Sequence, residues 1–267
     1  MEKIGLIAGN RKFPILFCEA AKDKGYHIVA VAIKGDTSSA INRSAGKTYW
    51  IGLNEFSKMF EIFKGERITK VVMAGQVSPH RLFSKEINKD EALRGLLENI
   101  RDKKADTIFG AVAAKLKDNG FELLDSTIFI EEHLPKKGTL TKSEPDQFLR
   151  EDIDFGFGLA KAIGGLDIGQ TVAVKSKAVI AVEALEGTDN LIRRAGRISR
   201  GGFTLIKASK PKQDMRFDIP VVGLNTIRNL VRAKARCLAI EADKTLFIDR
   251  QESVRLADKK GIVIVAV

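Results

Sequence analysis

Short apolar runs alternate with amphipathic stretches over the first half of the chain. Three runs rich in β-branched and small apolar residues predict buried strands, at 3–9, 27–35 and 69–75. Helical spacing predicts helices over 14–24, 54–63 and 91–101. Repeated strand–helix units of this kind predict a parallel sheet covered by helices. The expected fold class is therefore α/β.

The pattern changes in the second half of the chain. The stretch 134–148 contains two prolines, a glycine and many polar residues, which is typical of an interdomain linker. Beyond it we expect a helix over 152–163 and a hairpin over 171–185 that turns near Ser176 and Lys177. Further strands are expected at 202–209, 245–250 and 261–267, with a helix over 225–239. The prediction is an N-terminal domain over 1–133 and a distinct C-terminal α/β domain over 149–267.

Positive charge is concentrated in one segment of the C-terminal half. The chain carries a net charge of +11, and residues 193–236 hold twelve bases against only Asp214 and Asp218, a net +10. This concentration indicates an anionic partner such as a phosphate, a nucleic acid or an acidic membrane surface. Single-stranded nucleic acid is the least favoured of these, because Phe203 and Phe217 are the segment's only aromatic residues.

Several classes of protein are disfavoured by what the sequence lacks. No apolar run is long enough to span a bilayer, and the start MEKIGLIAG does not resemble a signal peptide, so we expect a cytoplasmic protein. Cys18 and Cys237 are too few for a disulfide framework or a zinc site, and the three histidines show no ligand spacing. The sequence has neither a Walker A loop nor a nucleophile elbow, which argues against P-loop NTPases and serine hydrolases.

The segment 207–226, KASKPKQDMRFDIPVVGLNT, carries the most informative charges. Asp214, Arg216 and Asp218 alternate in it, and in an extended chain alternating side chains project from one face. Two carboxylates beside an arginine could hold a divalent metal and a phosphate together. The competing interpretation is an exposed edge strand with solvated charges.

The first predicted strand leads into a loop that resembles a weak nucleotide-binding turn. Only Gly5 and Gly9 are present, so the Rossmann fingerprint is incomplete, although Asp36 follows the second strand. Backbone N–H groups could still bind a nucleotide here, and a purely structural use of the glycines stays open. The loops at 9–11 and 75–80 are where ligands bind in such sheets.

A second polar cluster, EALEGTDNLIRRAG, follows the predicted hairpin. It contains Glu183, Glu186 and Asp189 around a Gly-Thr turn, and then Arg193 and Arg194. Thr188 is expected to cap the helix that begins near Asp189. A helix N-terminus beside carboxylates suits a metal and a phosphate together, while a capped helix with incidental acids is the alternative.

Taken in order, these motifs closely resemble the LpxI family. The resemblance includes GLIAG, TLTKSEPD, EDIDFG, GQTVAVKSKAVIAVEALEGTDNLIRRAG, KASKPKQDMRFDIPVVGLNT and ADKTLFIDR, and it runs from the first strand to the C-terminus. It implies a Rossmann-like N-terminal domain and Mg²⁺-dependent hydrolysis of UDP-2,3-diacylglucosamine. Water would attack the α-phosphorus to give UMP and lipid X. The resemblance also implies a homodimer that binds its lipid-linked substrate between the domains.

The residues that match the family motifs give the predicted site. The predicted catalytic residues are Asp214, Asp218 and Arg216, with Asp214 the first choice because the family's essential acid falls in the QDxRxD motif. Substrate contacts are predicted for Gly9, Asn10, Gln76, Gly187, Thr188, Arg193, Lys210 and Gln213. The predicted Mg²⁺ ligands are Asp214, Asp218, Glu186 and Asp189. The remaining bases are expected to hold the protein against the anionic inner membrane surface.

Two other functions remain as alternatives. An NAD(P)-binding oxidoreductase would use the first domain, although its glycine loop is weak. A non-catalytic nucleic-acid-binding protein would use the basic segment 193–236. We expect no nucleic-acid partner, because Asp214 and Asp218 in that segment would repel phosphates unless a metal intervened.

Overall fold

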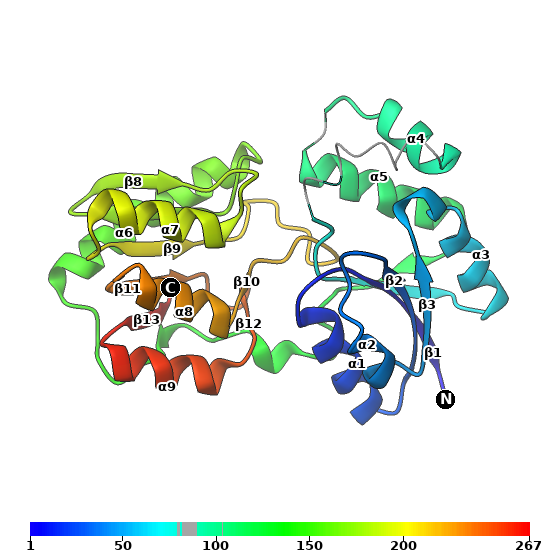
Figure 1. Cartoon of the computed structure of the whole chain (residues 1–267), viewed down its shortest axis with the longest axis horizontal. Coiled ribbons are helices and arrows are strands. Elements are labelled where there is room, and N and C mark those ends of the chain that lie inside the picture. The colour runs from blue at the N-terminus through cyan, green and yellow to red at the C-terminus, as the bar shows by residue number, and fades with distance from the viewer. Residues whose placement is uncertain (79–80, 82–89, 103) are drawn as a thin grey trace. The chain divides into compact units, whose positions relative to one another are not determined.

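The computed structural model describes residues 1–78, 81, 90–102 and 104–267 and contains two compact units (Figure 1). The N-terminal unit comprises Met1–Glu131 together with the short segment Asp214–Asp218. The C-terminal unit comprises Glu132–Gln213 and Ile219–Val267. The chain thus leaves the C-terminal unit for five residues and then returns to it.

The N-terminal unit is built on a parallel five-stranded sheet in the order β3-β2-β1-β4-β5. Its strands are β1 (Lys3–Ala8), β2 (His27–Ile33), β3 (Lys47–Ile51), β4 (Lys70–Ala74) and β5 (Glu122–Leu123). The predicted α/β class and the three predicted strands are confirmed, and β3 and β5 were not predicted. The strand order reverses between β1 and β4, which is where open sheets of this kind bind ligands.

Helices fill the connections between these strands. They are α1 (Phe13–Asp23), α2 (Ile41–Ser44), the 3₁₀ turn η1 (Leu53–Glu55), α3 (Lys58–Gly65), α4 (Glu91–Glu98) and α5 (Ala105–Asp118). Pro14 lies in the first turn of α1, where its missing N–H has no intrahelical partner to lose. On one face of the sheet, Phe63 of α3 and Leu116 of α5 pack in one core with Val31 of β2. The predicted helices 14–24 and 54–63 correspond to α1 and to η1 with α3.

The C-terminal unit contains a mixed six-stranded sheet in the order β6-β13-β11-β9-β7-β8. Its strands are β6 (Gly138–Thr139), β7 (Thr171–Lys175), β8 (Ala178–Val182), β9 (Thr204–Lys207), β11 (Cys237–Ile240) and β13 (Val263–Ala266). Strands β9, β11 and β13 are parallel, whereas β6, β7 and β8 add antiparallel pairs. A two-stranded pair, β10 (Val221–Val222) and β12 (Leu246–Phe247), lies outside this sheet. The predicted second α/β domain is confirmed.

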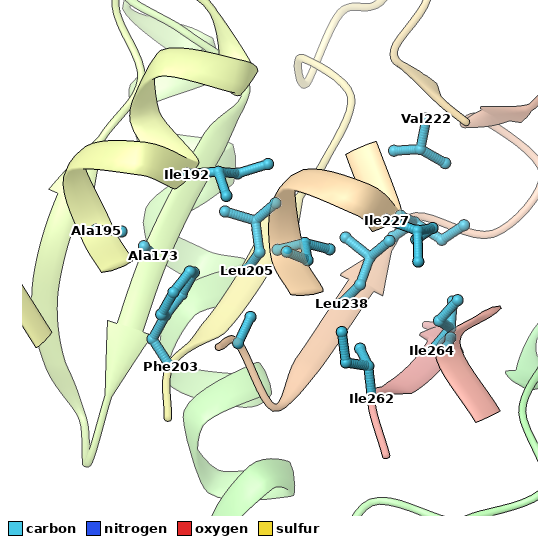
Figure 2. Packing of buried hydrophobic residues seen from close by; sticks show 14 of the residues in the cluster. Ala173, Ile192, Ala195, Phe203, Leu205, Val222, Ile227, Leu238, Ile262 and Ile264 are labelled. Carbon is cyan, nitrogen blue, oxygen red and sulfur yellow. The ribbon is translucent and has the colours of Figure 1, made fainter. Parts of the chain in front are cut away.

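Both faces of this sheet are covered. The helices are α6 (Gln147–Gly165), α7 (Thr188–Ser199), α8 (Leu224–Arg232) and α9 (Arg250–Lys260), after the 3₁₀ turn η4 (Glu131–His133). Leu205, Leu238 and Ile264 form a core with α7 and α8, as Figure 2 shows. The alternate residues of the same strands, such as Ile206, pack with α6. Period-two alternation on strands buried on both faces explains their continuous apolar sequences.

The hairpin was predicted correctly and one helix was not. Ser176 and Lys177 form the turn between β7 and β8, both with positive φ, at 51° and 58°. The expected helix over 225–239 is wrong at its C-terminal end, because α8 ends at Arg232 and β11 begins at Cys237. Lys234, with φ of 55°, reverses the chain between them.

The units also differ from the predicted domain ranges. The stretch predicted as a linker, 134–148, contributes β6, which pairs with β13 at the edge of the C-terminal sheet. Residues 214–218, which the prediction assigned to the C-terminal domain, pack with the N-terminal unit instead. No helix in the described part of the chain is long and apolar enough to cross a membrane.

Candidate active site

The carboxyl ends of β1 and β4 meet at the reversal point of the N-terminal sheet. The N–H of Gly9 donates to the carbonyl of Ala74 at 2.8 Å, and the N–H of Asn10 donates to the carbonyl of Gln76 at the same distance. Gly9, Asn10 and Gln76, three of the predicted substrate-binding residues, therefore lie side by side at the position where this fold binds ligands. Pro79 and His80 of the predicted loop lie outside the described residues.

Gly9 has a packing reason to be glycine. A Cβ at this position would lie 2.6 Å from the backbone nitrogen of Gln76, closer than real contacts allow. Gly75 adopts a φ of +81°, in the left-handed region that favours glycine.

Asn10 has an unsatisfied polar atom, because its buried Oδ1 accepts no hydrogen bond in the described structure. An amide oxygen without a donor at a ligand-binding edge is a position that a ligand can satisfy.

The acid after β2 is held by protein groups. The Asp36 carboxylate forms an ion pair of 2.8 Å with Arg81 and accepts hydrogen bonds from the backbone and hydroxyl of Ser78. Its side chain is almost fully buried. These contacts fix the loop after β4 against the end of β2, which is a structural task.

The segment 214–218 is a turn, and the expected extended strand is wrong. The N–H of Phe217 donates to the carbonyl of Asp214 at 3.2 Å, and Asp218 adopts a positive φ of 54°. Asp214, Arg216 and Asp218 are therefore not presented by the alternation of a strand. The physical reason is that this turn is fixed by contacts with the N-terminal unit rather than by a neighbouring strand.

Ser126 and Phe109 provide those contacts. The N–H of Ser126 donates to the carbonyl of Met215 at 3.0 Å, and its hydroxyl lies 2.7 Å from the carbonyls of both Met73 and Arg216. The Phe217 ring stacks on Phe109 with 5.6 Å between centroids and joins the apolar core. Because Met73 belongs to β4, the turn lies at the same carboxyl edge of the sheet as Asn10 and Gln76.

Within the turn, the Arg216 guanidinium binds both carboxylate oxygens of Asp214. Its Nε lies 2.9 Å from Oδ1 and its Nη2 lies 2.7 Å from Oδ2, the two-point geometry that guanidinium and carboxylate favour. The backbone N–H of Arg216 adds a third hydrogen bond of 3.0 Å. The hydrogen bonds from Arg216 outweigh partial burial and hold the pKa of Asp214 below its ordinary value. Asp214 is therefore an ionised, partly exposed carboxylate at neutral pH.

In the C-terminal unit, a buried ionic cluster lies where α7 begins. Glu183 and Lys207 lie 3.8 Å apart, both nearly buried. Thr188 donates to Glu183 at 2.6 Å and accepts from Lys207 at 3.0 Å. Burial opposes ionisation, but Lys207 and the hydroxyls of Thr171 and Thr188 outweigh it, so the pKa of Glu183 is lowered. The expectation that Thr188 caps α7 is wrong: the N-cap is Gly187, with φ of 77°.

Lys210 and Gln213 follow β9 in a closed turn. The Lys210 ammonium lies 2.6 Å from the carboxylate of Asp167, and both side chains are largely buried. The side-chain oxygen of Gln213 accepts the backbone N–H of Lys210 at 3.2 Å. Both predicted substrate contacts thus have protein partners in this structure.

Sequence reasoning missed a further ionic cluster at the same edge of the C-terminal sheet. The Lys161 ammonium lies 2.6 Å from Glu241, which follows β11, and 3.1 Å from the hydroxyl of Ser209, which follows β9. Ser209 donates its N–H and its hydroxyl to Glu241, each at 2.7 Å. The signal for Ser209 and Glu241 was their place directly after parallel strands, and it required the strand β11 to be recognised.

Two of the remaining predicted residues, Glu186 and Arg193, lie along a groove between α7 and α8. This groove has a volume of about 1110 Å³, and Glu186, Arg193 and Arg194 line it. Glu186 forms an ion pair of 2.6 Å with Arg194. Asp189 accepts the side-chain amides of Asn225 at 3.2 Å and Asn229 at 2.9 Å. Lys210 and Gln213 are not among the groove's lining residues in the described structure.

The predicted metal ligands do not form one compact carboxylate cage. Among the described residues, no group of three or more His, Cys, Asp or Glu side chains is arranged to hold a metal ion. Mg²⁺ commonly uses only one or two protein carboxylates and takes its other ligands from water and substrate phosphates. Asp214 and Asp218 share one short turn, and Arg216 binds both carboxylate oxygens of Asp214. Glu186 and Asp189 have the protein partners described above.

The two cysteines are not candidates for chemistry. Cys18 and Cys237 are free and buried, and burial raises the pKa of each thiol to about 12. A thiol with so high a pKa supplies almost no thiolate at neutral pH.

Comparison with known proteins identifies a family over the whole chain. Residues 3–133 match the LpxI N-terminal domain, and residues 136–265 match the LpxI C-terminal domain. A curated relative from Caulobacter vibrioides, the UDP-2,3-diacylglucosamine pyrophosphatase LpxI, is 31% identical over 277 residues. That alignment covers 100% of this chain and 98% of the relative.

Among solved structures the similarity is weak. A UDP-glucose 4-epimerase from Thermotoga maritima is 18% identical, with a TM-score of 0.29, over 45% of this chain and 35% of that chain. An N5-carboxyaminoimidazole ribonucleotide synthetase from the same organism is 20% identical, with a TM-score of 0.24, over 70% and 43% of the two chains. Similarities of this size carry no functional argument. The two domain matches and the full-length relative, by contrast, place the chain in the LpxI family.

Proposed function

We propose that this chain hydrolyses the pyrophosphate of UDP-2,3-diacylglucosamine in lipid A biosynthesis. The reaction requires Mg²⁺, and water attacks the α-phosphorus to give UMP and 2,3-diacylglucosamine 1-phosphate. The observation that supports it most is the 31% identity, over the whole chain, to a relative named for this activity. The carboxylate–guanidinium pair at a ligand-binding sheet edge adds chemistry suited to a pyrophosphate.

In this proposal Asp214 is the principal catalytic carboxylate. Its low pKa keeps it ionised, so it can accept a hydrogen bond from the attacking water or ligate a divalent cation. Arg216 holds both carboxylate oxygens and fixes their direction. The same guanidinium adds positive charge beside the phosphate as negative charge develops there.

Asp214 and Asp218 are the residues that would hold Mg²⁺ in this proposal. When bound, the ion neutralises charge on the pyrophosphate and lowers the cost of nucleophilic attack. Glu186 and Asp189 remain predictions for assisting roles, since each already binds protein groups. A metal at Glu186 would compete with Arg194.

The basic residues divide into two groups in this proposal. Arg193 is exposed and has no carboxylate partner among the described residues, so it can neutralise a phosphate directly. Lys210 can do so only by weakening its 2.6 Å pair with Asp167.

Asn10 and Gln76 are proposed to contact the nucleotide, with the unsatisfied Oδ1 of Asn10 accepting from a ligand N–H or hydroxyl.

The test is release of UMP from UDP-2,3-diacylglucosamine by the purified full-length chain. We expect turnover with Mg²⁺, loss of turnover after chelation with EDTA and recovery when Mg²⁺ is restored. Asp214→Asn should lower kcat by at least about 100-fold, the scale of removing one group that acts on the transition state. Asp118→Asn, which changes an exposed acid of α5, is the matched control and should leave kcat unchanged.

Two results would contradict the proposal. Unchanged turnover by a folded Asp214→Asn variant removes this residue from the mechanism, and an unchanged rate in EDTA removes the metal. Mass spectrometry of ligand that copurifies with Asp214→Asn tests the substrate independently, because the UDP-2,3-diacylglucosamine mass is expected there. The proposed homodimer is tested on the same preparation by light scattering.

A further inference from the structure

The groove between α7 and α8 gathers cations from two helices. Six of its lining side chains are basic: Arg193, Arg194, Arg197, Arg200, Arg232 and Lys234. Its only acidic lining residue among those described is Glu186. Five of the six cations are exposed, and Arg194 is half-buried. Much of the net +10 of segment 193–236 is therefore collected on one surface.

Most of this charge is not neutralised within the protein. Arg194 forms the ion pair with Glu186. None of the other five cations forms an ion pair with any residue that the structure describes. Arg232 reaches only the amide oxygen of Asn229, at 3.4 Å. Like charges held close together repel one another, so an anionic partner from outside would stabilise the groove.

Helix ends explain part of this arrangement. Arg197 and Arg200 lie at the C-terminal end of α7, and Arg232 and Lys234 lie at that of α8, where cations interact favourably with the helix dipole. That effect acts on each helix separately. The helix dipole does not explain why the basic ends of two helices line a single groove. An extended anionic surface that binds both ends would explain it.

We propose that this groove binds the phosphodiester head groups of an anionic membrane surface. An open groove with exposed, long cationic side chains fits many phosphates loosely better than one ligand tightly. Exposed apolar side chains adjoin it: Ile198 is 59% exposed one helical turn after Arg194, and Leu185, next to Glu186, is 60% exposed. Basic residues beside exposed apolar ones are the composition of surfaces that bind lipid head groups and acyl chains together.

Nucleic acid fits this groove less well. Its lining residues include no aromatic side chain on which a base could stack.

The membrane proposal rests on the proposed function in one respect, because a lipid-linked substrate gives the surface a purpose. Vesicle binding is measured without turnover, so the two proposals fail separately.

The experiment compares two double variants of the full-length chain. Arg197→Ala with Arg232→Ala removes two groove cations. Arg228→Ala with Lys259→Ala removes the same charge from exposed positions of α8 and α9 that do not line the groove. Cosedimentation is measured with vesicles of phosphatidylcholine alone and of phosphatidylcholine mixed with phosphatidylglycerol. Thermal unfolding of each variant checks that it is folded.

We expect the wild-type chain to bind the anionic vesicles and not the neutral ones. The groove variant should bind them about 30-fold more weakly, and the control variant at most a few-fold more weakly. Turnover of detergent-solubilised substrate should be unchanged in the groove variant. Absence of wild-type binding to anionic vesicles, or equal losses in the two variants, overturns the proposal. So does a groove variant that keeps vesicle binding but loses binding of inorganic pyrophosphate or duplex DNA.

Discussion

Arg216 and Asp214 form a two-point contact within one short turn, with Nε–Oδ1 and Nη2–Oδ2 distances of 2.9 and 2.7 Å. Both side chains belong to a segment that the N-terminal unit holds, although the segment lies within the C-terminal half of the sequence. The proposed catalytic carboxylate therefore has its protonation set by its own neighbour and its position set by Ser126 and Phe109. These two controls can be separated by mutation.

Arg216→Gln tests the control of protonation. The Arg216 hydrogen bonds are the main cause of the lowered pKa of Asp214, so their loss raises that pKa. As the pH falls, the Asp214 carboxylate is then protonated, and becomes inactive, at a higher pH than in the wild-type chain. We expect the acidic limb of the kcat/KM profile to move to higher pH, in addition to a lower plateau. An acidic limb that stays in place would show that Asp214 does not govern it.

Ser126→Ala tests the control of position. The buried Ser126 hydroxyl lies 2.7 Å from the carbonyls of Met73 and Arg216, and the substitution removes the single O–H that these two acceptors share. We expect the free energy of unfolding to fall by about 1–3 kcal/mol and kcat to fall as the turn loses its anchor. Urea unfolding and turnover measure the two effects. Ser57→Ala, which removes a hydroxyl bound to Asp90 in the same unit, should affect stability without the same loss of kcat.

Phe217→Ala tests the apolar half of the anchor. Phe217 is buried and stacks on Phe109, so truncation leaves a cavity in the core of the N-terminal unit. A loss of about 3 kcal/mol in the free energy of unfolding is expected. Phe148→Ala removes the same atoms from a side chain that is 74% exposed and should cost less than about 0.5 kcal/mol. Similar losses in the two variants would mean that Phe217 is not packed as described.

Lys207→Met tests the buried pair beside α7. Removing Lys207 leaves Glu183 buried without its counter-charge, which should cost about 3–5 kcal/mol of the free energy of unfolding at neutral pH. The pKa of Glu183 is lowered in the folded protein, so this stabilisation is present at neutral pH and lost as acid protonates the carboxyl. The cost of Lys207→Met should therefore shrink at acidic pH.

An exposed pair provides the control for that measurement. Lys177 and Glu151 form an ion pair of 2.9 Å at the surface, and Lys177→Met should change the free energy of unfolding by at most about 1 kcal/mol. Chemical denaturation of both variants at neutral and acidic pH gives the comparison. Equal costs for the two lysines would contradict a buried ionic role for Lys207.

The apolar runs predicted most of the parallel strands, because strands buried on both faces are apolar throughout. Strand β11 was missed for a local reason. Residues 225–239 continue a helical pattern, and the chain reverses at Lys234 in a left-handed conformation that usually requires glycine or asparagine. No residue type there signals the end of α8. The boundary depends on tertiary packing of Leu238 and Ile240 in the core.

The sequence also identified the residues of the proposed catalytic motif better than it predicted their arrangement in space. The motif containing Asp214 and Arg216 could be found from charge and resemblance, but its turn is fixed by Phe109 and Ser126, about 90 to 110 positions earlier along the chain. Contacts of such separation leave no local pattern. The Lys161–Glu241 pair was missed for the same reason, since 80 residues separate its members.

The excursion of residues 214–218 limits how this architecture can be inherited. A recombination event that exchanged only the first 131 residues would also remove the surface that receives Phe217 and the hydroxyl that binds Arg216. Such a chimera would keep the sequence of the proposed catalytic motif but would lose the residues that hold its turn in place. An exchange of the N-terminal unit would therefore have to keep the residues that contact this turn, even though each unit has a sheet and a core of its own.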